Sequence, residues 1–148
     1  MDIKKLVLAN LPYSAPFLFV DAFDELSDDL AIGRYRFKEN EFFYQGHFPG
    51  NPITPGVILT ETAAQIGLVG LGIYHLIKEE KLAHVTPLFS SAEVDFLLPV
   101  YPGEEVQVHA TKKYFRFNKL KCHVKMTNER GEKVCEGYLS GFMIEKNN

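Results

Sequence analysis

The longest apolar stretch of the chain covers residues 57–77 and is interrupted by few polar side chains, among them Glu61 and Gln65. A stretch of this length without strict alternation favours one long buried helix over a strand. Thr54 followed by Pro55 is a helix-start signature, because a hydroxyl caps free amides and proline costs nothing at the first helical position. We therefore expect the helix to begin at Pro55 with Thr54 as its cap.

Strand-like patterns rich in aromatic and β-branched residues lie on both sides of this helix. They predict strands over residues 17–26, 30–37, 86–100, 104–117, 120–127 and 133–144. Pro99 breaks the pattern near the end of the third of these strands. The acidic turn 27–29 joins the first two strands into a hairpin, and turns at Asn118 and 128–131 separate the last three. Residues 3–10 predict a short separate helix that ends before Pro12.

Length and composition indicate one domain. The 148 residues, 46% of them hydrophobic, can bury a core without disulfides or metals, and no repeat or linker divides them. One long apolar helix and about six antiparallel strands predict an α+β domain over residues 1–148, whose sheet covers the helix. The net charge of −3 argues against a nucleic-acid partner.

The remaining composition favours a cytoplasmic protein. Cys122 and Cys135 have no nearby ligand pair for zinc, so we expect two reduced thiols. The N-terminal residues lack the apolar core of a secretory signal. The stretch 56–77 is long enough to cross a bilayer, but its polar side chains and four glycines make it a poor membrane span.

The loop before the long helix carries candidate chemistry. Its prolines exclude helix and stiffen the backbone around His47, a potential base. Glu61 and Gln65 are four residues apart and share one helix face, so Gln65 can bond to Glu61 and orient it. Apolar neighbours should raise the pKa of Glu61 and keep it protonated. The Gly56 amide lies in the first helical turn and can hold an oxyanion. These are the parts needed to remove water from a 3-hydroxyacyl thioester.

A longer motif carries a family resemblance. Gly46-His47-Phe48-Pro49-Gly50-Asn51-Pro52, Pro55-Gly56-Val57, and Glu61 with Ala64-Gln65 resemble the FabZ-type 3-hydroxyacyl-[acyl-carrier-protein] dehydratases. Matching residues upstream and downstream extend the resemblance over roughly residues 11–105. The sister FabA group has aspartate at the position of Glu61, which favours the FabZ type.

This resemblance implies a hot-dog fold, in which an antiparallel sheet wraps one long helix and two subunits pair. It implies a homodimer with shared active sites, or a trimer of such dimers. It also implies catalysis by His47 and Glu61 without cofactor or metal. Gly56, Gln65, Phe48 and Val57 would bind substrate. The expected reaction converts a (3R)-hydroxyacyl group on acyl carrier protein to the trans-2-enoyl thioester, in fatty acid or polyene biosynthesis. Alternatives are another hot-dog enzyme, a thioesterase or an enoyl-CoA hydratase, and a catalytically silent acyl-binding subunit.

The chain departs from the family where positive charge is common. Tyr13-Ser14 replaces a usual His-Arg, Ala22 follows Asp21 where arginine is common, and Leu97-Leu98 replaces an arginine pair. These changes remove positive charge near the mouth of the site, where an acidic carrier protein would dock. A possible replacement is the basic set Lys112, Lys113, Arg116, Lys119 and Lys121. Phe42, Phe43, Phe89 and Phe96 are candidates for setting the shape of an acyl pocket.

Overall fold

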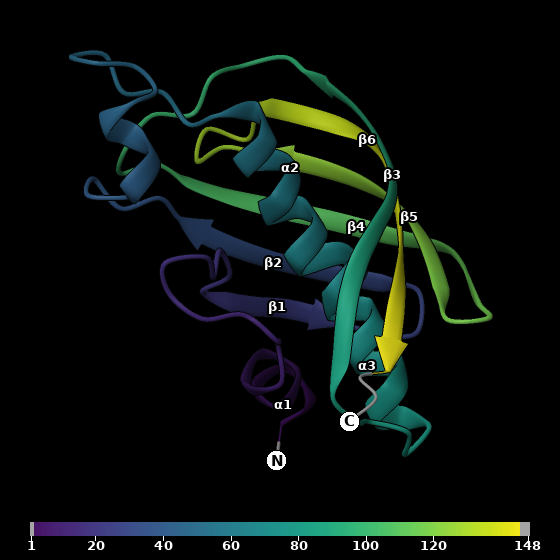
Figure 1. Cartoon of the computed structure of the whole chain (residues 1–148). Coiled ribbons are helices and arrows are strands. Elements are labelled where there is room, and N and C mark those ends of the chain that lie inside the picture. Colours follow the sequence, from purple (N-terminus) through teal and green to yellow (C-terminus); the bar gives the residue numbers. More distant parts are fainter. Residues whose placement is uncertain (1, 146–148) are drawn as a thin grey trace.

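The computed structural model describes residues 2–145 as one antiparallel sheet and one long helix. The elements are α1 (Ile3–Ala9), β1 (Ala22–Leu26), β2 (Leu30–Arg36), the 3-10 helix η1 (Phe42–Gln45), α2 (Gly56–Ala64), the π-helical η2 (Gln65–Val69), α3 (Gly70–Lys78), β3 (Val85–Phe96), β4 (Glu105–Arg116), β5 (Lys119–Thr127) and β6 (Lys133–Glu145). The strands pair in the order β1-β2-β4-β5-β6-β3. Figure 1 shows the sheet curving around the helix, with β3 crossing the helix at one end of the sheet.

The alternation in β5 places one face of the strand against the helix. Leu120, Cys122, Val124 and Met126 are buried, whereas Lys121, His123 and Lys125 between them are partly or fully exposed. Both cysteines are free and buried. The predicted antiparallel sheet around one central helix is thus confirmed, because the period-two pattern gives each strand one apolar face to bury.

The central helix runs without a break from Gly56 to Lys78 as α2, η2 and α3. Its length and hydropathy would allow a membrane crossing, but 78% of its most apolar window is buried inside the fold. The predicted start was wrong by one residue: Pro55 is the N-cap, and no side chain caps the helix. Thr54 is buried and its hydroxyl shares a 2.6 Å hydrogen bond with the Tyr44 hydroxyl instead.

Two strand boundaries also differ from the prediction. Residues 17–21 are loop rather than strand, and β1 begins only at Ala22. The backbone of this loop bonds to the Gln65 side chain instead of a neighbouring strand. The strand predicted over residues 86–100 ends at Phe96, because the Leu97 and Leu98 amides both donate to the Val134 carbonyl oxygen and leave the ladder.

Strand β3 forms one edge of the sheet and is mostly exposed. One side of the strand pairs with β6, and the other has no strand neighbour among residues 2–145. Its exposed side chains include Leu88, Phe89 and Phe96. A long apolar edge of this kind is normally covered in the functional state of a protein.

Candidate active site

The loop that carries His47 is fixed by its own backbone. The Phe48 and Asn51 backbones exchange two hydrogen bonds of 2.9 and 2.8 Å, which close a tight turn at Gly50, where φ is +73°. The Thr54 amide donates to the Val100 carbonyl oxygen and ties the end of the loop to the segment after β3. His47 therefore has a defined position between η1 and α2.

The hydrogen bond of the His47 ring determines which nitrogen is free. Nδ1 lies 2.7 Å from the Ile53 carbonyl oxygen, and the Ile53 amide donates back to the His47 carbonyl oxygen. A carbonyl oxygen can only accept, so Nδ1 carries the hydrogen and Nε2 of the neutral ring keeps its lone pair. The ring also stacks on Phe48 with centroids 4.0 Å apart. His47 is thus arranged to accept a proton at Nε2.

Gln65 holds Glu61 from within the helix. The Gln65 Nε2 group donates to Glu61 Oε2 at 3.0 Å and to the Phe17 carbonyl oxygen at 3.1 Å. Its Oε1 accepts the Phe19 amide at 2.8 Å. Because that amide can only donate, the Gln65 side chain cannot be flipped, and its NH2 group must face Glu61. The predicted contact between Gln65 and Glu61 is present, and within the described part of the chain Glu61 Oε1 accepts no hydrogen bond.

The surroundings of Glu61 favour the neutral form of its carboxyl. Burial raises the pKa of Glu61 above its usual value, and the Gln65 hydrogen bond acts in the opposite direction with a smaller effect. A carboxylic acid that stays protonated near neutral pH can donate a proton to a leaving group. The predicted direction of the pKa shift of Glu61 is therefore confirmed.

Gly56, Val57 and Glu61 lie together along one groove between α2 and β3. The groove is otherwise mostly apolar, and Phe89 and Phe96 form its β3 side. It adjoins a cavity of about 240 Å³ that begins at Glu61 and continues toward the end of β6. The start of the helix, the acid and the apolar space thus lie side by side.

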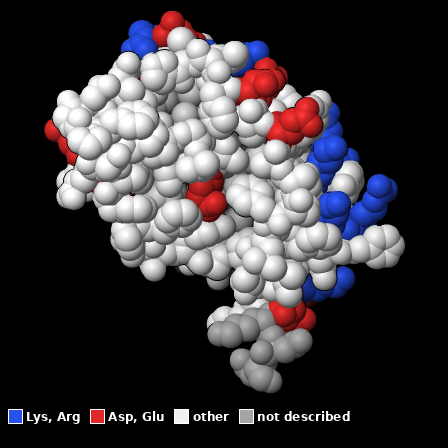
Figure 2. Space-filling model, turned by 45° about the horizontal axis from the view of Figure 1, so that its top comes forward, with Lys and Arg blue, Asp and Glu red and all other residues white. Residues whose placement is uncertain are grey.

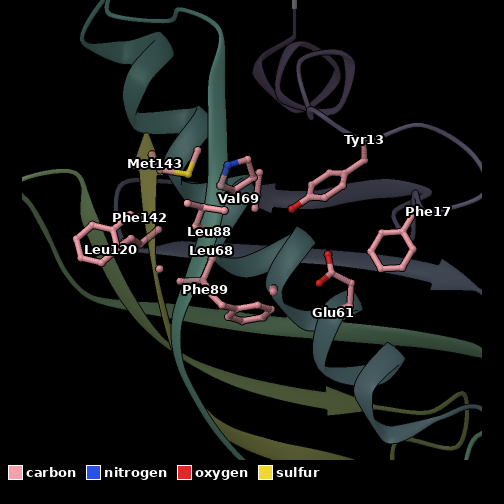
Figure 3. Close-up of a pocket in the computed structure, with 13 residues that line it drawn as sticks. Tyr13, Phe17, Glu61, Leu68, Val69, Leu88, Phe89, Leu120, Phe142 and Met143 are labelled. Carbon is pink, nitrogen blue, oxygen red and sulfur yellow. The ribbon is translucent and has the colours of Figure 1, made fainter. Parts of the chain in front are cut away.

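His47 and Phe48 line neither the groove nor the cavity within this chain. Phe42 and Phe43 do not border them either: Phe43 packs against Phe19 and Phe37 in the core. Of the four predicted wall residues, Phe89 lines both the cavity and the groove, and Phe96 lines the groove. Phe17 and Phe142 also line the cavity, as the close-up in Figure 3 shows. Across residues 2–145, no three histidine, cysteine or acidic side chains gather to form a metal site.

Sequence reasoning missed two groups that shape this site. Tyr13 was noted only as a departure from a family pattern, yet its ring lines the cavity that holds Glu61. The buried Tyr44–Thr54 pair joins both ends of the His47 loop. Neither contact could be predicted from neighbouring residues. Tyr13 lies 48 residues before Glu61, and the hydrophobic pattern of the sequence does not show which loop covers the helix.

Sequence comparison places the chain among known dehydratases. A family model described as a FabA-like domain matches residues 11–137. The curated 3-hydroxyacyl-[acyl-carrier-protein] dehydratase FabZ of Caldicellulosiruptor saccharolyticus is 37% identical over 139 residues, which is 90% of this chain and 92% of that protein. The resemblance carried by residues 46–65 therefore extends over most of the chain.

Structural comparison supports the same fold. The solved dehydratase heterocomplex ApeI:P from Xenorhabdus doucetiae has a TM-score of 0.80 at 16% identity, covering 95% of this chain and 91% of the other. A hypothetical thioesterase from Streptococcus pneumoniae solved with coenzyme A has a TM-score of 0.59 at 13% identity, covering 85% and 87%. These likenesses establish the predicted hot-dog fold. With the family model spanning residues 11–137, this protein belongs to the FabA-like family.

Proposed function

We propose that this protein is a cytoplasmic homodimeric dehydratase that converts (3R)-hydroxyacyl groups on acyl carrier protein to trans-2-enoyl thioesters in acyl-chain biosynthesis. The observation that carries the proposal is Glu61. It is the one carboxylic acid lining an otherwise nearly apolar cavity, it is held by Gln65, and its raised pKa favours the protonated form that can donate a proton. The names of the curated relatives supply the substrate class.

In this reaction, Nε2 of His47 accepts the proton from C2 of the acyl chain. The electron pair of the C2–H bond forms the C2=C3 double bond as the C3–O bond breaks. Glu61 gives its proton to the departing oxygen, which leaves as water. The free amide of Gly56, at the positive end of the helix dipole, donates to the thioester oxygen while charge builds on it.

Substrate contacts follow from the same arrangement. Val57 is 76% exposed beside Gly56 and provides apolar surface at the mouth of the groove. A Cβ atom added at Gly56 would lie 3.3 Å from the Phe96 ring, so glycine keeps the approach to the helix start open. Phe48 stacks on the His47 ring and leaves about half of its own surface exposed for contact with a substrate.

A second copy of the chain completes the site in this proposal. His47 does not line the cavity beside Glu61 within one chain, and the exposed apolar edge of β3 adjoins the groove. Figure 2 shows a broad surface with little charge on this molecule, with lysines and arginines gathered at the margins. Pairing two copies along β3 would cover that apolar edge and let each chain supply one half of two shared sites.

The basic set around the β4–β5 hairpin fits an acidic carrier protein. The ammonium groups of Lys113 and Lys121 lie over the Tyr138 ring, and that of Lys119 lies over Phe142, so three cations share one face of the sheet. Lys112 does not belong to this set, because it pairs with Asp29 at 3.5 Å. Charge complementarity of this kind mainly accelerates association.

A charge-reversal experiment tests the docking face. Lys119→Glu combined with Lys121→Glu should raise KM for the carrier-bound substrate by about tenfold and leave KM for the same acyl group on pantetheine unchanged. The double variant Lys4→Glu and Lys5→Glu, both in the distant α1, is the matched control. If the hairpin variant keeps the KM of the unmodified enzyme for the carrier-bound substrate, this surface is removed from the proposal.

Mass spectrometry of a (3R)-hydroxyacyl carrier protein tests the function itself. The purified protein should produce a species lighter by one water with the acyl group still attached. Loss of the whole acyl group would mean a thioesterase, and an unchanged substrate that still binds would mean an acyl-binding subunit. Conversion of only the coenzyme A ester would point to an enoyl-CoA hydratase running in reverse.

A further inference from the structure

The cavity beside Glu61 contains one other hydrogen-bonding side chain, that of Tyr13. All remaining lining residues are apolar: Phe17, Ala64, Leu68, Val69, Pro87, Leu88, Phe89, Leu120, Gly141, Phe142 and Met143. Cavities that bind small molecules commonly combine an apolar wall with a few placed polar groups that fix orientation. Two such groups in one small cavity therefore mark where a polar atom of the ligand lies.

Tyr13 is held in place from several directions. It is half-buried, its ring packs against the core, and it lies in the loop between α1 and β1. Gln65 bonds the backbone of this loop at Phe17 and Phe19, so the side chain that orients Glu61 also positions the loop of Tyr13. In Figure 3 the Tyr13 hydroxyl and the Glu61 carboxyl both point into the space between the loop and the helix.

The Tyr13 hydroxyl is available to a ligand. Among residues 2–145, its oxygen has no hydrogen-bond partner, and none joins it directly to Glu61. Burial and the nearby Glu61 raise the pKa of Tyr13, so the phenol keeps its hydrogen throughout the working pH range and remains a donor. Partly buried tyrosine hydroxyls commonly have a partner, and a polar atom of a ligand in the cavity can supply it here.

We infer that the Tyr13 hydroxyl donates a second hydrogen bond to the oxygen on C3 of the substrate, so that this oxygen lies between Tyr13 and Glu61. The inference rests on the proposed dehydration. When the C3–O bond breaks, Glu61 gives up its proton and Tyr13 keeps its own. The water that forms then has two polar partners, the phenol and the Glu61 carboxylate, in a cavity that offers no others. A buried water needs two to four such partners.

Ligand-binding measurements distinguish this hydrogen-bonding role of Tyr13 from a role as a mere part of the cavity wall. In a His47→Ala background, where chemistry is blocked, Kd is measured for (3R)-3-hydroxyhexanoyl-pantetheine and for hexanoyl-pantetheine. Adding Tyr13→Phe should weaken the hydroxyacyl ligand by about 3- to 10-fold, the effect of one hydrogen bond, and leave the saturated ligand unchanged. Equal weakening of both ligands, or of neither, would overturn the inference.

Kinetics in the otherwise unmodified enzyme provides the second readout. Tyr13→Phe should lower kcat for water loss about 10- to 100-fold, because the bond strengthens as charge develops on the departing oxygen. Tyr74→Phe is the matched control, since its hydroxyl donates to Asp28 at 3.3 Å on the far end of the helix. If the unmodified enzyme releases no water, the proposed function fails. If it does and Tyr13→Phe keeps its full rate, only the inference about Tyr13 fails.

Discussion

The raised pKa of Glu61 favours the protonated form that its proposed role requires, and this shift should be visible in how the stability of the fold depends on pH. Burial raises the pKa of its carboxyl above the usual 4.5. The folded protein then binds that proton more tightly than the unfolded chain does. Ionisation of Glu61 therefore costs folding free energy, beginning as the pH rises past the unfolded pKa and reaching a constant value above the folded pKa.

The first prediction follows from this loss of folding free energy with rising pH. Glu61→Gln removes the cost, so the Tm of the variant relative to the unmodified protein should rise between about pH 4 and about pH 8. The informative quantity is how the Tm of the variant minus the Tm of the unmodified protein changes with pH. Altered packing adds to this Tm difference an offset that does not depend on pH. Thermal unfolding at several pH values measures it. A difference that stays constant, or falls, over this range would mean that folding does not raise the pKa of Glu61.

The proposed proton transfers give a second residue-scale prediction. His47→Ala or Glu61→Gln should lower kcat by at least about a hundredfold, the usual scale for a general acid or base. Circular dichroism should show an intact fold in both variants, since neither side chain belongs to the buried apolar core. Near-normal turnover in either variant would remove that residue from the mechanism.

At the scale of elements, the close approach of the helix to the sheet depends on glycine. A Cβ atom added at Gly67 in η2 would lie 2.9 Å from the Ala110 Cβ and 3.2 Å from Val124. The Ala110 Cβ in β4 moves only with its backbone, and the Val124 side chain in β5 is buried. Gly67→Val should therefore lower the free energy of unfolding by about 1–3 kcal/mol, the usual effect of overpacking.

Urea unfolding measures this change, and Gly46→Ala is the control. An added Cβ at Gly46 meets nothing within 4 Å, and the residue has an ordinary negative φ of −102°. The control should change stability little. If Gly67→Val unfolds at the same urea concentration as the unmodified protein, the helix and the sheet are not packed as tightly as described.

The elements that the sequence predicted well are those with a repeating pattern. In the alternating pattern of β5 and in the long apolar run of the central helix, many residues indicate the same type of secondary structure. Residues 17–21 looked like strand for the same reasons, but their backbone bonds to Gln65, which lies far along the chain. A contact between distant segments leaves no local pattern, and Tyr13 was missed as a cavity residue for the same reason.

The site itself was predictable only in part. The positions of Glu61 and Gln65 four residues apart on one helix predicted their hydrogen bond correctly. The helix start was misplaced because Thr54 finds the Tyr44 hydroxyl, supplied by η1, in preference to the helix amides. Local capping rules describe the segment alone, whereas a buried hydroxyl takes the partner that the tertiary fold provides.

At the scale of the whole molecule, the central claim is that two chains together form each active site. The proposed base lies on a loop outside the cavity that holds the proposed acid. In a two-fold dimer, the His47 loop of one chain would face the Glu61 helix of the other, which gives two equivalent composite sites. Each site would then depend on one residue from each subunit.

Refolding a His47→Ala chain together with a Glu61→Gln chain tests this claim most directly. In a hybrid dimer, one site collects both substitutions and the other has neither. Equal amounts of the two chains make about half the dimers hybrid, so roughly a quarter of the unmodified activity should return, while each variant refolded alone stays inactive. If native mass spectrometry shows hybrid dimers and no activity returns, then His47 and Glu61 act within one subunit and the shared site is wrong.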